Sequence, residues 1–478
     1  MQGMKRNKGD RSERPVMDLR STRNPFVVAA AIVLALACDG SPLFAATYYV
    51  DPLGAHELPY DTWDAAATDI QSAIDVAEDG DTVLVTDGLY LVTAQIEIAR
   101  GIEVRSVNGA AATTVDRVGP ENHRLFHLAN ANACLDGFTL THGSANGSNG
   151  ADKYGGAVLM YGGARIMNCV VSNNEAAARG GGISFVSAPG GLVQNCVIAR
   201  NRSGGDGGGL FGSGCTVQNS TIFDNYAWAD GGGAHVDGSA LIANCRVENN
   251  VAGRAGGGLL ARGSEIRNCL IVGNVSSNRG GGVGHYIDSP GQYFNCTIVG
   301  NWAPVGGGAE DGTFINTILY GNSAPDEANY HTGTFFHCCS VPAPDGPGNI
   351  SADPQFLDGD SFRLSPSSPC IDAGTNDFET ARTNDLDGAP GIVHGVVDMG
   401  AYEYRECLHS ISNSGDGVLC TWNIMPDEAY RFERNTNLQP TNWFPVFETS
   451  GEESTNVEFF DYNPAGIGFY RAVYLPPD

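Results

Sequence analysis

Short apolar runs alternate with polar corners along the middle of the chain, and the alternation repeats. Between Asn168 and Asn322 an asparagine, five residues and a second asparagine recur seven times, enclosing apolar runs such as Cys196-Val197-Ile198. A glycine triplet follows six of the seven pairs, and a second apolar run follows each triplet. The pairs begin 21 to 27 residues apart, a period that predicts a solenoid. Because neither run can bury itself alone, each coil must stack on its neighbours at the strand spacing of about 4.8 Å.

The corner residues have structural roles of their own. Asparagine tolerates left-handed backbone, and its amide can bond to the identical amide one coil away. Glycine supplies positive φ or a bare backbone at a sharp bend. A phosphate-binding loop fits the triplets poorly, because no Gly-Lys-Ser/Thr follows them.

Five cysteines share one repeat position, which serine and threonine occupy in other units. Because those residues replace cysteine there, we expect a buried stack of free thiols rather than disulfides. The stack consists of Cys169, Cys196, Cys245, Cys269 and Cys296, with Ser220 and Thr317.

The regions on either side of the repeats predict other elements. Thr47 to Val50 is a predicted strand, and Asp64 to Glu78 is a predicted helix with Ile70, Ala73, Ile74 and Ala77 on one face. A helix at this place suits an end cap, which a solenoid needs to cover its open edge. Cys407 to Asp478 loses the glycines and gains aromatic residues, and its six strand-like runs predict a small β-sandwich. Cys407 and Cys420 flank a predicted hairpin there and are the best disulfide candidates.

Charge and the first residues indicate the compartment. The net charge of -27 argues against nucleic acid as a partner. Basic residues, the apolar run from Phe26 to Ala37 and a cleavage site near Thr47 predict a signal peptide over residues 1–46. The apolar run is too short to span a bilayer, so we expect no transmembrane span in the mature chain. Translation could start at Met1 or Met17, and Cys38 leaves a lipoprotein open as an alternative.

Several segments resemble known secreted proteins. Trp63 to Ile74, followed by Gly80-Asp81-Thr82-Val83, resembles the start of bacterial extracellular right-handed parallel β-helix proteins of the pectin-lyase-like superfamily. The units, for example Ile198-Ala199-Arg200-Asn201, are similar to polymorphic outer membrane protein repeats, although Val, Ile or Leu stands where that family often has Phe. Asp353 to Glu403, with Ser368 to Gly374 at its centre, is similar to the closing segment of choice-of-anchor-type β-helix proteins. These resemblances imply a protein secreted by a bacterium or held on its outer surface.

We therefore expect an all-β chain in three parts. Residues 1–46 form the signal peptide. Residues 47–406 form a right-handed parallel β-helix that includes the N-terminal helical cap and a closing segment at 353–403. Residues 407–478 form the small β-sandwich. We expect this chain to act as a monomer.

Alternation along the strand after each triplet selects the candidate site. The first residue of each strand should face inward, so the second and fourth should face out. These outward positions place His235, Asp237, Arg262, Tyr286 and Glu310 on one exposed sheet, where β-helix lyases of the resembled superfamily carry their chemistry. An Arg or Tyr could act as a base, and a carboxylate could hold calcium against an acidic sugar. The alternative is that Asp237 and Arg262, one coil apart, form an ordinary surface ion pair.

Other pairs of carboxylates lie at spacings that bear on glycoside hydrolysis. Asp237 and Glu310 are three coils apart, roughly 14 Å by strand spacing, which is too far for an inverting glycosidase at about 6.5–9.5 Å. Asp206 and Asp230 are one coil apart and could approach the separation of a retaining enzyme, but arginines hold the same position on other coils, which favours a charged ladder.

The run from Asn384 to Gly388 has the oxygen density of a calcium loop, with Asp385 and Asp387 as candidate ligands. It lacks the distal glutamate of an EF-hand, and an Asx turn is the alternative. We expect no other cofactor.

The sequence thus supports three hypotheses for function. The first is a binding, adhesive or structural role toward an extracellular glycan or another surface partner. The second is a polysaccharide lyase that acts on acidic polysaccharide by β-elimination. The third is a structural stalk that presents the C-terminal module.

Overall fold

The computed structural model describes residues 45–186, 190–285, 289–377, 384–388, 390–393 and 395–405, and six strands between 409 and 475. Its contacts divide the chain into Met1–Ala45 and Ala46–Asp478, and the elements below belong to the second unit. The predicted signal peptide lies outside the described residues except for Ala45 and Ala46. Within the part of the chain that is described, no helix is long and apolar enough to cross a membrane.

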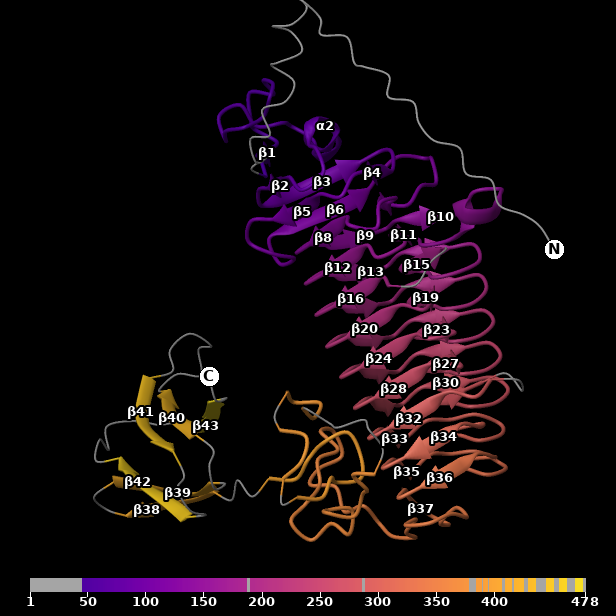
Figure 1. Ribbon diagram of the computed structural model, residues 1–478, viewed down its shortest axis with the longest axis vertical. Helices are drawn as coiled ribbons and strands as arrows, with labels where there is room; N and C mark the ends of the chain where they lie inside the picture. Colours follow the sequence, from indigo (N-terminus) through magenta and orange to yellow (C-terminus); the bar gives the residue numbers. More distant parts are fainter. Residues whose placement is uncertain are drawn as a thin grey trace, which may run out of the picture. The chain divides into compact units, whose positions relative to one another are not determined.

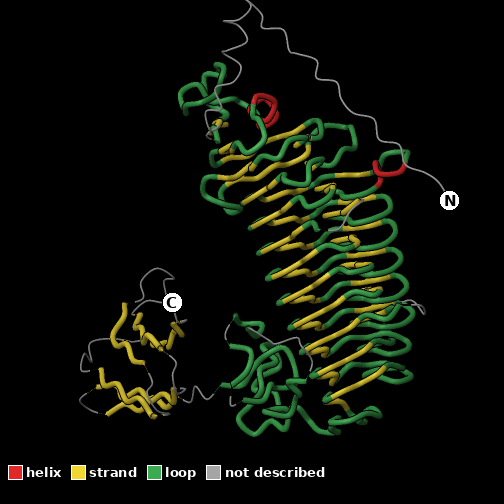
Figure 2. The backbone as a smooth tube through the Cα atoms, viewed as in Figure 1, coloured by secondary structure: helices red, strands yellow, loops and turns green. Residues whose placement is uncertain are grey.

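The repeats fold as stacked coils, which confirms the predicted right-handed parallel β-helix (Figure 1). A regular coil gives one strand to each of four parallel sheets, named A, B, D and C in the order in which the chain visits them. Register partners are one repeat apart, as in Val193 with Val217 on sheet A and Ile198 with Ile222 on sheet B. Figure 2 shows these short strands joined by loops at the corners of the coils.

Neighbouring strands within each sheet come from successive coils. Sheet A consists of β1 (Thr47–Val50), β2 (Thr82–Val85), β5 (Glu103–Ser106), β8 (Cys134–Asp136), β12 (Arg165–Met167), β16 (Leu192–Gln194), β20 (Thr216–Gln218), β24 (Leu241–Ala243), β28 (Glu265–Arg267), β32 (Gln292–Phe294), β34 (Thr313–Ile315) and β36 (Thr334–Phe336). Sheet B consists of β3 (Gly88–Val92), β6 (Thr113–Arg117), β9 (Thr139–Thr141), β13 (Val170–Ser172), β17 (Val197–Ala199), β21 (Thr221–Phe223), β25 (Arg246–Glu248), β29 (Leu270–Val272), β33 (Thr297–Val299), β35 (Ile318–Tyr320) and β37 (Cys339–Ser340). Sheet C consists of β31 (Val283–Gly284), β27 (Leu259–Arg262), β23 (Ala234–Asp237), β19 (Leu210–Ser213), β15 (Ile183–Val186), β11 (Val158–Tyr161), β7 (Phe126–Leu128) and β4 (Ile96–Ile98). Sheet D consists of β10 (Ser144–Ala145), β14 (Glu175–Ala176), β18 (Arg202–Ser203), β22 (Tyr226–Ala227), β26 (Val251–Ala252) and β30 (Val275–Ser276).

The two asparagines of each unit hold two different corners. The first asparagine of every pair has left-handed backbone, with φ between 49° and 54°. The second is buried, and its amide donates to the amide oxygen of the next coil, as in Asn225 Nδ2 to Asn250 Oδ1 at 3.0 Å. The same oxygen also accepts the backbone N–H of Asn225 at 3.0 Å. The predicted amide ladder is therefore confirmed, and it runs along the buried corner.

The glycine triplets make the bend before sheet C, as predicted. The first glycine of each has positive φ, for example 67° at Gly231. The second leaves no room for a side chain, because a Cβ on Gly257 would lie 2.3 Å from the carbonyl oxygen of Gly281 on the next coil. Adjacent bends can approach this closely only when both lack side chains.

The cysteine stack is also confirmed. The ten cysteines from Cys134 to Cys370 all lie in described segments, and all are buried free thiols. Burial raises the pKa of Cys196 to about 12, as expected for a thiol that packs as a small apolar group. The predicted Cys407–Cys420 disulfide lies outside what the structure describes.

The N-terminal helix is shorter than predicted. It is α2 (Ile70–Val76), not Asp64 to Glu78. Asp69 has extended backbone and caps the helix by accepting the N–H of Ser72 at 2.9 Å. Before it, the carbonyls of Ala65 and Ala66 accept from Glu57 and His56 instead of continuing a helix.

The predicted apolar face of this helix is nevertheless buried. Ile70, Ala73 and Ile74 face the interior, and Ala77 is buried just after the helix. The helix packs against β1, β2 and β4, the place predicted for an end cap. A short 3₁₀ helix, Gly150–Lys153, lies farther along the chain.

The closing segment lies along the outer side of sheet B. Gly400 donates its N–H to the carbonyl of Asn316 at 2.8 Å, and Ala401 donates to Thr297 Oγ1 at 2.9 Å. The C-terminal module contains the six predicted strands, in two antiparallel sheets of three. One sheet is β38 (His409–Ser414), β39 (Gly417–Ile424) and β42 (Thr455–Asp461), and the other is β41 (Phe444–Ser450), β40 (Ala429–Asn435) and β43 (Phe469–Leu475). The boundaries of the three predicted parts remain predictions.

Candidate functional site

The outer face of sheet C is less exposed than the alternation predicted. The first residues of its strands face the core, as expected, but the second residues are buried as well. Their exposed fractions are 0% for Ser184, 8% for Phe211, 5% for His235, 0% for Leu260 and 5% for Glu310. The prediction that His235 and Glu310 are exposed was therefore wrong.

The bend before each triplet explains this burial. After the glycines the chain doubles back, so the residue that precedes a triplet lies over the second residue of a neighbouring strand. The guanidinium of Arg179 lies 4.6 Å from the ring centroid of Phe211, and Arg279 Nη1 lies 2.6 Å from Glu310 Oε1. Side chains before the triplets thus form much of the real surface of this face.

His235 lies between two carboxylates in this layer. Its Nε2 is 3.3 Å from Asp237 Oδ1, and its Nδ1 is 4.0 Å from Asp206 Oδ2. Its ring also packs against Phe211, with 5.1 Å between the centroids. Because only 7% of the imidazole is exposed, His235 holds the carboxylates in place and does not face solvent.

Asp237 is held as an anion by its surroundings. Burial acts to raise its pKa, but the hydrogen bond and charge of His235, with the charges of Arg262 and Arg179, outweigh burial and lower it. Arg262 is its register partner on the next strand, which agrees with the predicted spacing of one coil. About a third of the Asp237 side chain is exposed, 29%, so the anion is accessible.

The remaining predicted site residues are not part of this group. Glu310 lies three coils farther along, where it pairs with Arg279. Asp230 is buried and accepts the N–H of Ala255 at 3.0 Å, so its place in the ladder is structural. Tyr286 lies outside the described residues.

A hollow of about 230 Å³ opens beside Asp237 on sheet C. Aromatic and apolar side chains form part of its wall, while hydroxyl groups, a carboxylate and a guanidinium form the rest. Its lining residues are Tyr154, Arg179, Ser184, Phe185, Val186, Phe211, Ser213 and Asp237. Sequence reasoning missed Tyr154 and treated Arg179 only as a member of a ladder. The signal that could have found Arg179 is its position directly before a glycine triplet, and Tyr154 holds the equivalent place before the pair Gly155-Gly156.

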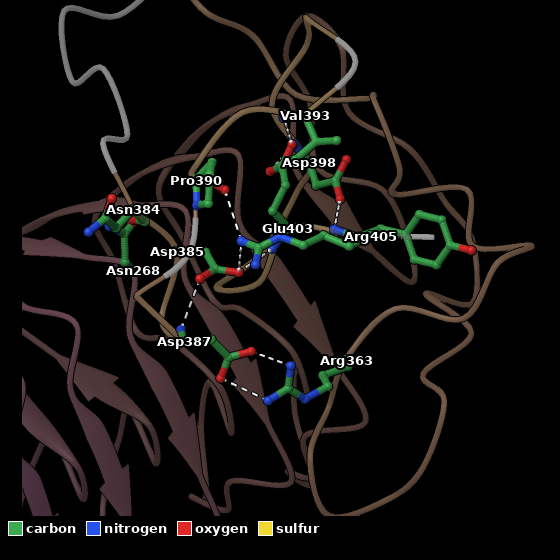
Figure 3. Close-up of polar contacts among 11 residues, drawn as sticks. Asn268, Arg363, Asn384, Asp385, Asp387, Pro390, Val393, Asp398, Glu403 and Arg405 are labelled. Atoms are coloured by element: carbon green, nitrogen blue, oxygen red, sulfur yellow. Dashed lines mark hydrogen bonds and ion pairs between the residues drawn. The ribbon is translucent and has the colours of Figure 1, made fainter. Parts of the chain in front are cut away.

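The two candidate calcium ligands are already bonded within the closing segment (Figure 3). Asp385 Oδ1 accepts the N–H of Asp387 at 3.0 Å, which is the hydrogen bond of an Asx turn. Its other oxygen lies 3.3 Å from Arg405 Nη2. Arg363 pairs with both oxygens of Asp387, one at 2.8 Å. These partners favour the Asx turn over a calcium site, since the oxygens that the ion would need are engaged, and calcium binding stays a prediction.

A larger cleft of about 430 Å³ lies between the loop from Asn384 to Gly388 and the coils beside it. Its lining includes Asn219, Asn244, Arg246, Asp387 and Tyr402. The charges here are paired, because Arg246 bonds Glu248 at 2.6 Å and also donates to the Tyr402 hydroxyl at 3.1 Å.

The stacked coils, the buried amide ladder and the parallel register define the chain as a right-handed parallel β-helix protein. A family model described as "Right handed beta helix region" matches residues 107–274 and 146–324. The comparison with curated proteins finds no matching sequence.

Solved structures share the fold at low sequence identity. A pectate lyase, Pel9A, is 16% identical with a TM-score of 0.53, covering 75% of this chain and 96% of its own. A complex of XylC with xylose is 9% identical, with a TM-score of 0.41 and coverage of 89% and 100%. The A-module of the mannuronan C-5 epimerase AlgE4 from Azotobacter vinelandii is 18% identical, with a TM-score of 0.34 and coverage of 57% and 86%. The first likeness supports the fold, and the other two are too distant to add to it.

Proposed function

We propose that this protein binds an extracellular glycan through the hollow on sheet C. The observation that carries the proposal is the composition of that hollow, in which aromatic and apolar walls adjoin Asp237, Arg179 and Ser213. Ligand pockets of this kind combine apolar surface with a few polar groups that fix orientation. A sugar ring needs both, because its C–H face is apolar and its edge carries hydroxyl groups.

The charged groups are arranged for recognition. Arg179 is stacked over Phe211 and lies 5.5 Å from the Tyr154 ring centroid, so its guanidinium is held in one orientation. A guanidinium held in this way can donate two parallel hydrogen bonds. Asp237 is accessible and ionised, and it can accept hydrogen bonds from sugar hydroxyls.

The geometry favours binding over β-elimination. A general base must reach the proton that it removes. His235 is buried and bonded to Asp237, and Glu310 is bonded to Arg279, so neither faces the hollow. Arg262 is exposed and remains the residue on which a lyase reaction would depend.

The proposal includes the predicted context of this site. We propose that the signal peptide of residues 1–46 directs export, and that the protein acts as a secreted or surface-held binding protein of a bacterium. The likeness to a pectate lyase supports a glycan as the ligand class, although that likeness extends to the fold alone.

A glycan array followed by calorimetry with the best ligand tests the proposal. Arg179→Ala should weaken binding about tenfold or more, a loss of about 1.4 kcal/mol. Arg202→Ala is the matched control, because Arg202 stacks on Tyr226 at 5.2 Å on sheet D, away from the hollow, and should change affinity less than about twofold.

Two outcomes would overturn the proposal. Equal affinity of the Arg179→Ala and Arg202→Ala variants would place the glycan elsewhere. Release of unsaturated sugars from an acidic polysaccharide by the native protein, lost in Arg262→Ala, would show a lyase instead of a binding protein.

A further inference from the structure

Two cysteines outside the thiol stack meet at the junction between the β-helix and the closing segment. Cys339 lies on β37, the last strand of sheet B, and Cys370 lies in the closing segment. Both are completely buried, in a small core with Ile318, Leu364 and Met399 that is separate from the main core. Each thiol affects the pKa of the other, and the Cys339 thiol also donates to the carbonyl of Ala352 at 3.3 Å.

The alternation of the strand separates this pair from the stack. Cys338, one residue earlier, belongs to the main core, and its thiol points to the carbonyl oxygen of Phe314 at 3.4 Å. Neighbouring residues on a strand face opposite sides, so Cys339 faces out of the coil toward the closing segment. The backbone holds Cys370 in place, because its carbonyl accepts the N–H of Met399 at 3.0 Å.

We propose that Cys339 and Cys370 are an oxidation site, and that a disulfide between them fastens the closing segment to the last strand of the β-helix. The site is independent of the glycan proposal, because its residues do not line the hollow on sheet C. Its consequence is mechanical, since the bond would close a loop from residue 339 to residue 370 and keep the small core covered.

The chemistry requires a disulfide oxidant, such as oxidised glutathione or an oxidised thiol–disulfide oxidoreductase. The thiolate of one cysteine attacks one sulfur of the oxidant and releases the other as a thiolate, which gives a mixed disulfide. The other cysteine loses its proton and attacks the Sγ of the first, which releases the second thiolate of the oxidant. Two thiols of the protein become one disulfide, and the oxidant is reduced to two thiols.

The contact between the thiols affects the acidity of both in the docked structure. The hydrogen bond from Cys370 is the largest influence on Cys339 and lowers its pKa against the opposing effect of burial. The same contact, with burial, raises the pKa of Cys370. Either thiol can attack the oxidant first, because this contact forms only once the closing segment is docked. Because both are buried once the segment is docked, the oxidant must reach them before docking is complete.

Peptide mapping of the full chain tests the proposal. The protein is refolded with a mixture of oxidised and reduced glutathione, alkylated, and digested with trypsin without reduction. Trypsin places Cys339 in peptide 280–363 and Cys370 in peptide 364–382, so a disulfide joins these two peptides. We expect the joined species in most of the molecules, and its loss after reduction.

Variants identify the bonded residues, because peptide 280–363 also contains Cys296 and Cys338. Cys338→Ser is the matched control and should leave the joined peptides unchanged, while Cys339→Ser should abolish them. Separate peptides from the oxidised native protein would overturn the proposal, and so would joined peptides that survive Cys339→Ser. The native protein alone decides the first outcome, even where a variant fails to fold.

Discussion

Removal of one amide from the buried ladder tests whether this ladder holds the coils together. Asn250 is fully buried near the middle of the regular coils. Its side chain accepts from the N–H and the amide of Asn225, both at 3.0 Å. It donates to the carbonyl of Ile222 at 2.9 Å and to the amide oxygen of Asn274 at 3.0 Å. Asn250→Ala therefore removes four hydrogen bonds across three coils.

The expected cost follows from these partners. The N–H of Asn225 is left buried without an acceptor, which costs about 1–3 kcal/mol. The other three bonds contribute about 0.5–1 kcal/mol each, because Asn274 Oδ1 and the Asn225 amide retain other partners. We expect a total loss of about 3–5 kcal/mol, large against the usual stability of about 5–15 kcal/mol.

Hydrogen exchange is the suitable assay, because coils of a solenoid can open without global unfolding. A loss of about 3 kcal/mol should speed exchange about 100-fold in peptides that cover residues 222–274, with a smaller effect on distant coils. Urea unfolding followed by circular dichroism gives the global change.

Asn249→Gly is the matched control for this variant. Asn249 is exposed and has φ of 53°, and glycine holds the equivalent position at Gly273, Gly300 and Gly321. Glycine adopts this conformation readily, so the change should stay within about 0.5 kcal/mol. A loss below about 1 kcal/mol for Asn250→Ala, equal to that of the control, would refute the ladder as a source of stability.

Three further outcomes follow from the structure. Gly257→Ala should cost more than about 3 kcal/mol, because its Cβ would strike the next coil, while Gly359→Ala, which meets nothing within 4 Å, should be neutral in urea unfolding. The lowered pKa of Asp237 means that its ionised form stabilises the fold above its unfolded pKa of about 3.9. This stability is lost as pH falls through the lower folded pKa, so Asp237→Asn should destabilise the protein at neutral pH and lose its effect in strong acid; a pH-independent difference would contradict this. Burial raises the pKa of Cys196 to about 12, so native protein at neutral pH should leave this thiol unalkylated by iodoacetamide until denaturant is added, and equal labelling in both states would exclude burial.

The repeat could be predicted from the sequence because each coil repeats the same local requirement. Asparagine, glycine and small core residues recur at similar spacing, so each unit independently indicates the same coil geometry. The helix was harder to bound, since its apolar spacing continues across Asp64 to Thr68, where nothing in the spacing shows that Ala65 and Ala66 bond back to Glu57 and His56. Propensity identified the element, but long-range hydrogen bonds fixed its start.

The candidate site was only partly predictable for a related reason. Strand alternation correctly placed Asp237 and Arg262 on the accessible side of sheet C, but it also assigned His235 and Glu310 to solvent. Alternation describes which side of a sheet a residue faces, and it does not describe what covers that side. The covering layer depends on how the triplet folds back, which is a property of several coils together.

This covering layer also determines where the protein can vary. The residues before the six triplets are Arg179, Asp206, Asp230, Ala255, Arg279 and Val305, and Tyr154 holds the equivalent place before Gly155-Gly156. Together they include aromatic, basic, acidic and aliphatic side chains. We expect substitution of the glycines after them or of the buried asparagines before them to destabilise the coils. The repeat therefore fixes the coils and leaves one variable position in each coil, which lies above the buried second residues of the sheet C strands. Arg179 holds one of these positions and lines the hollow. We therefore expect the residues before the triplets to determine ligand preference on this face more than the strands beneath them do.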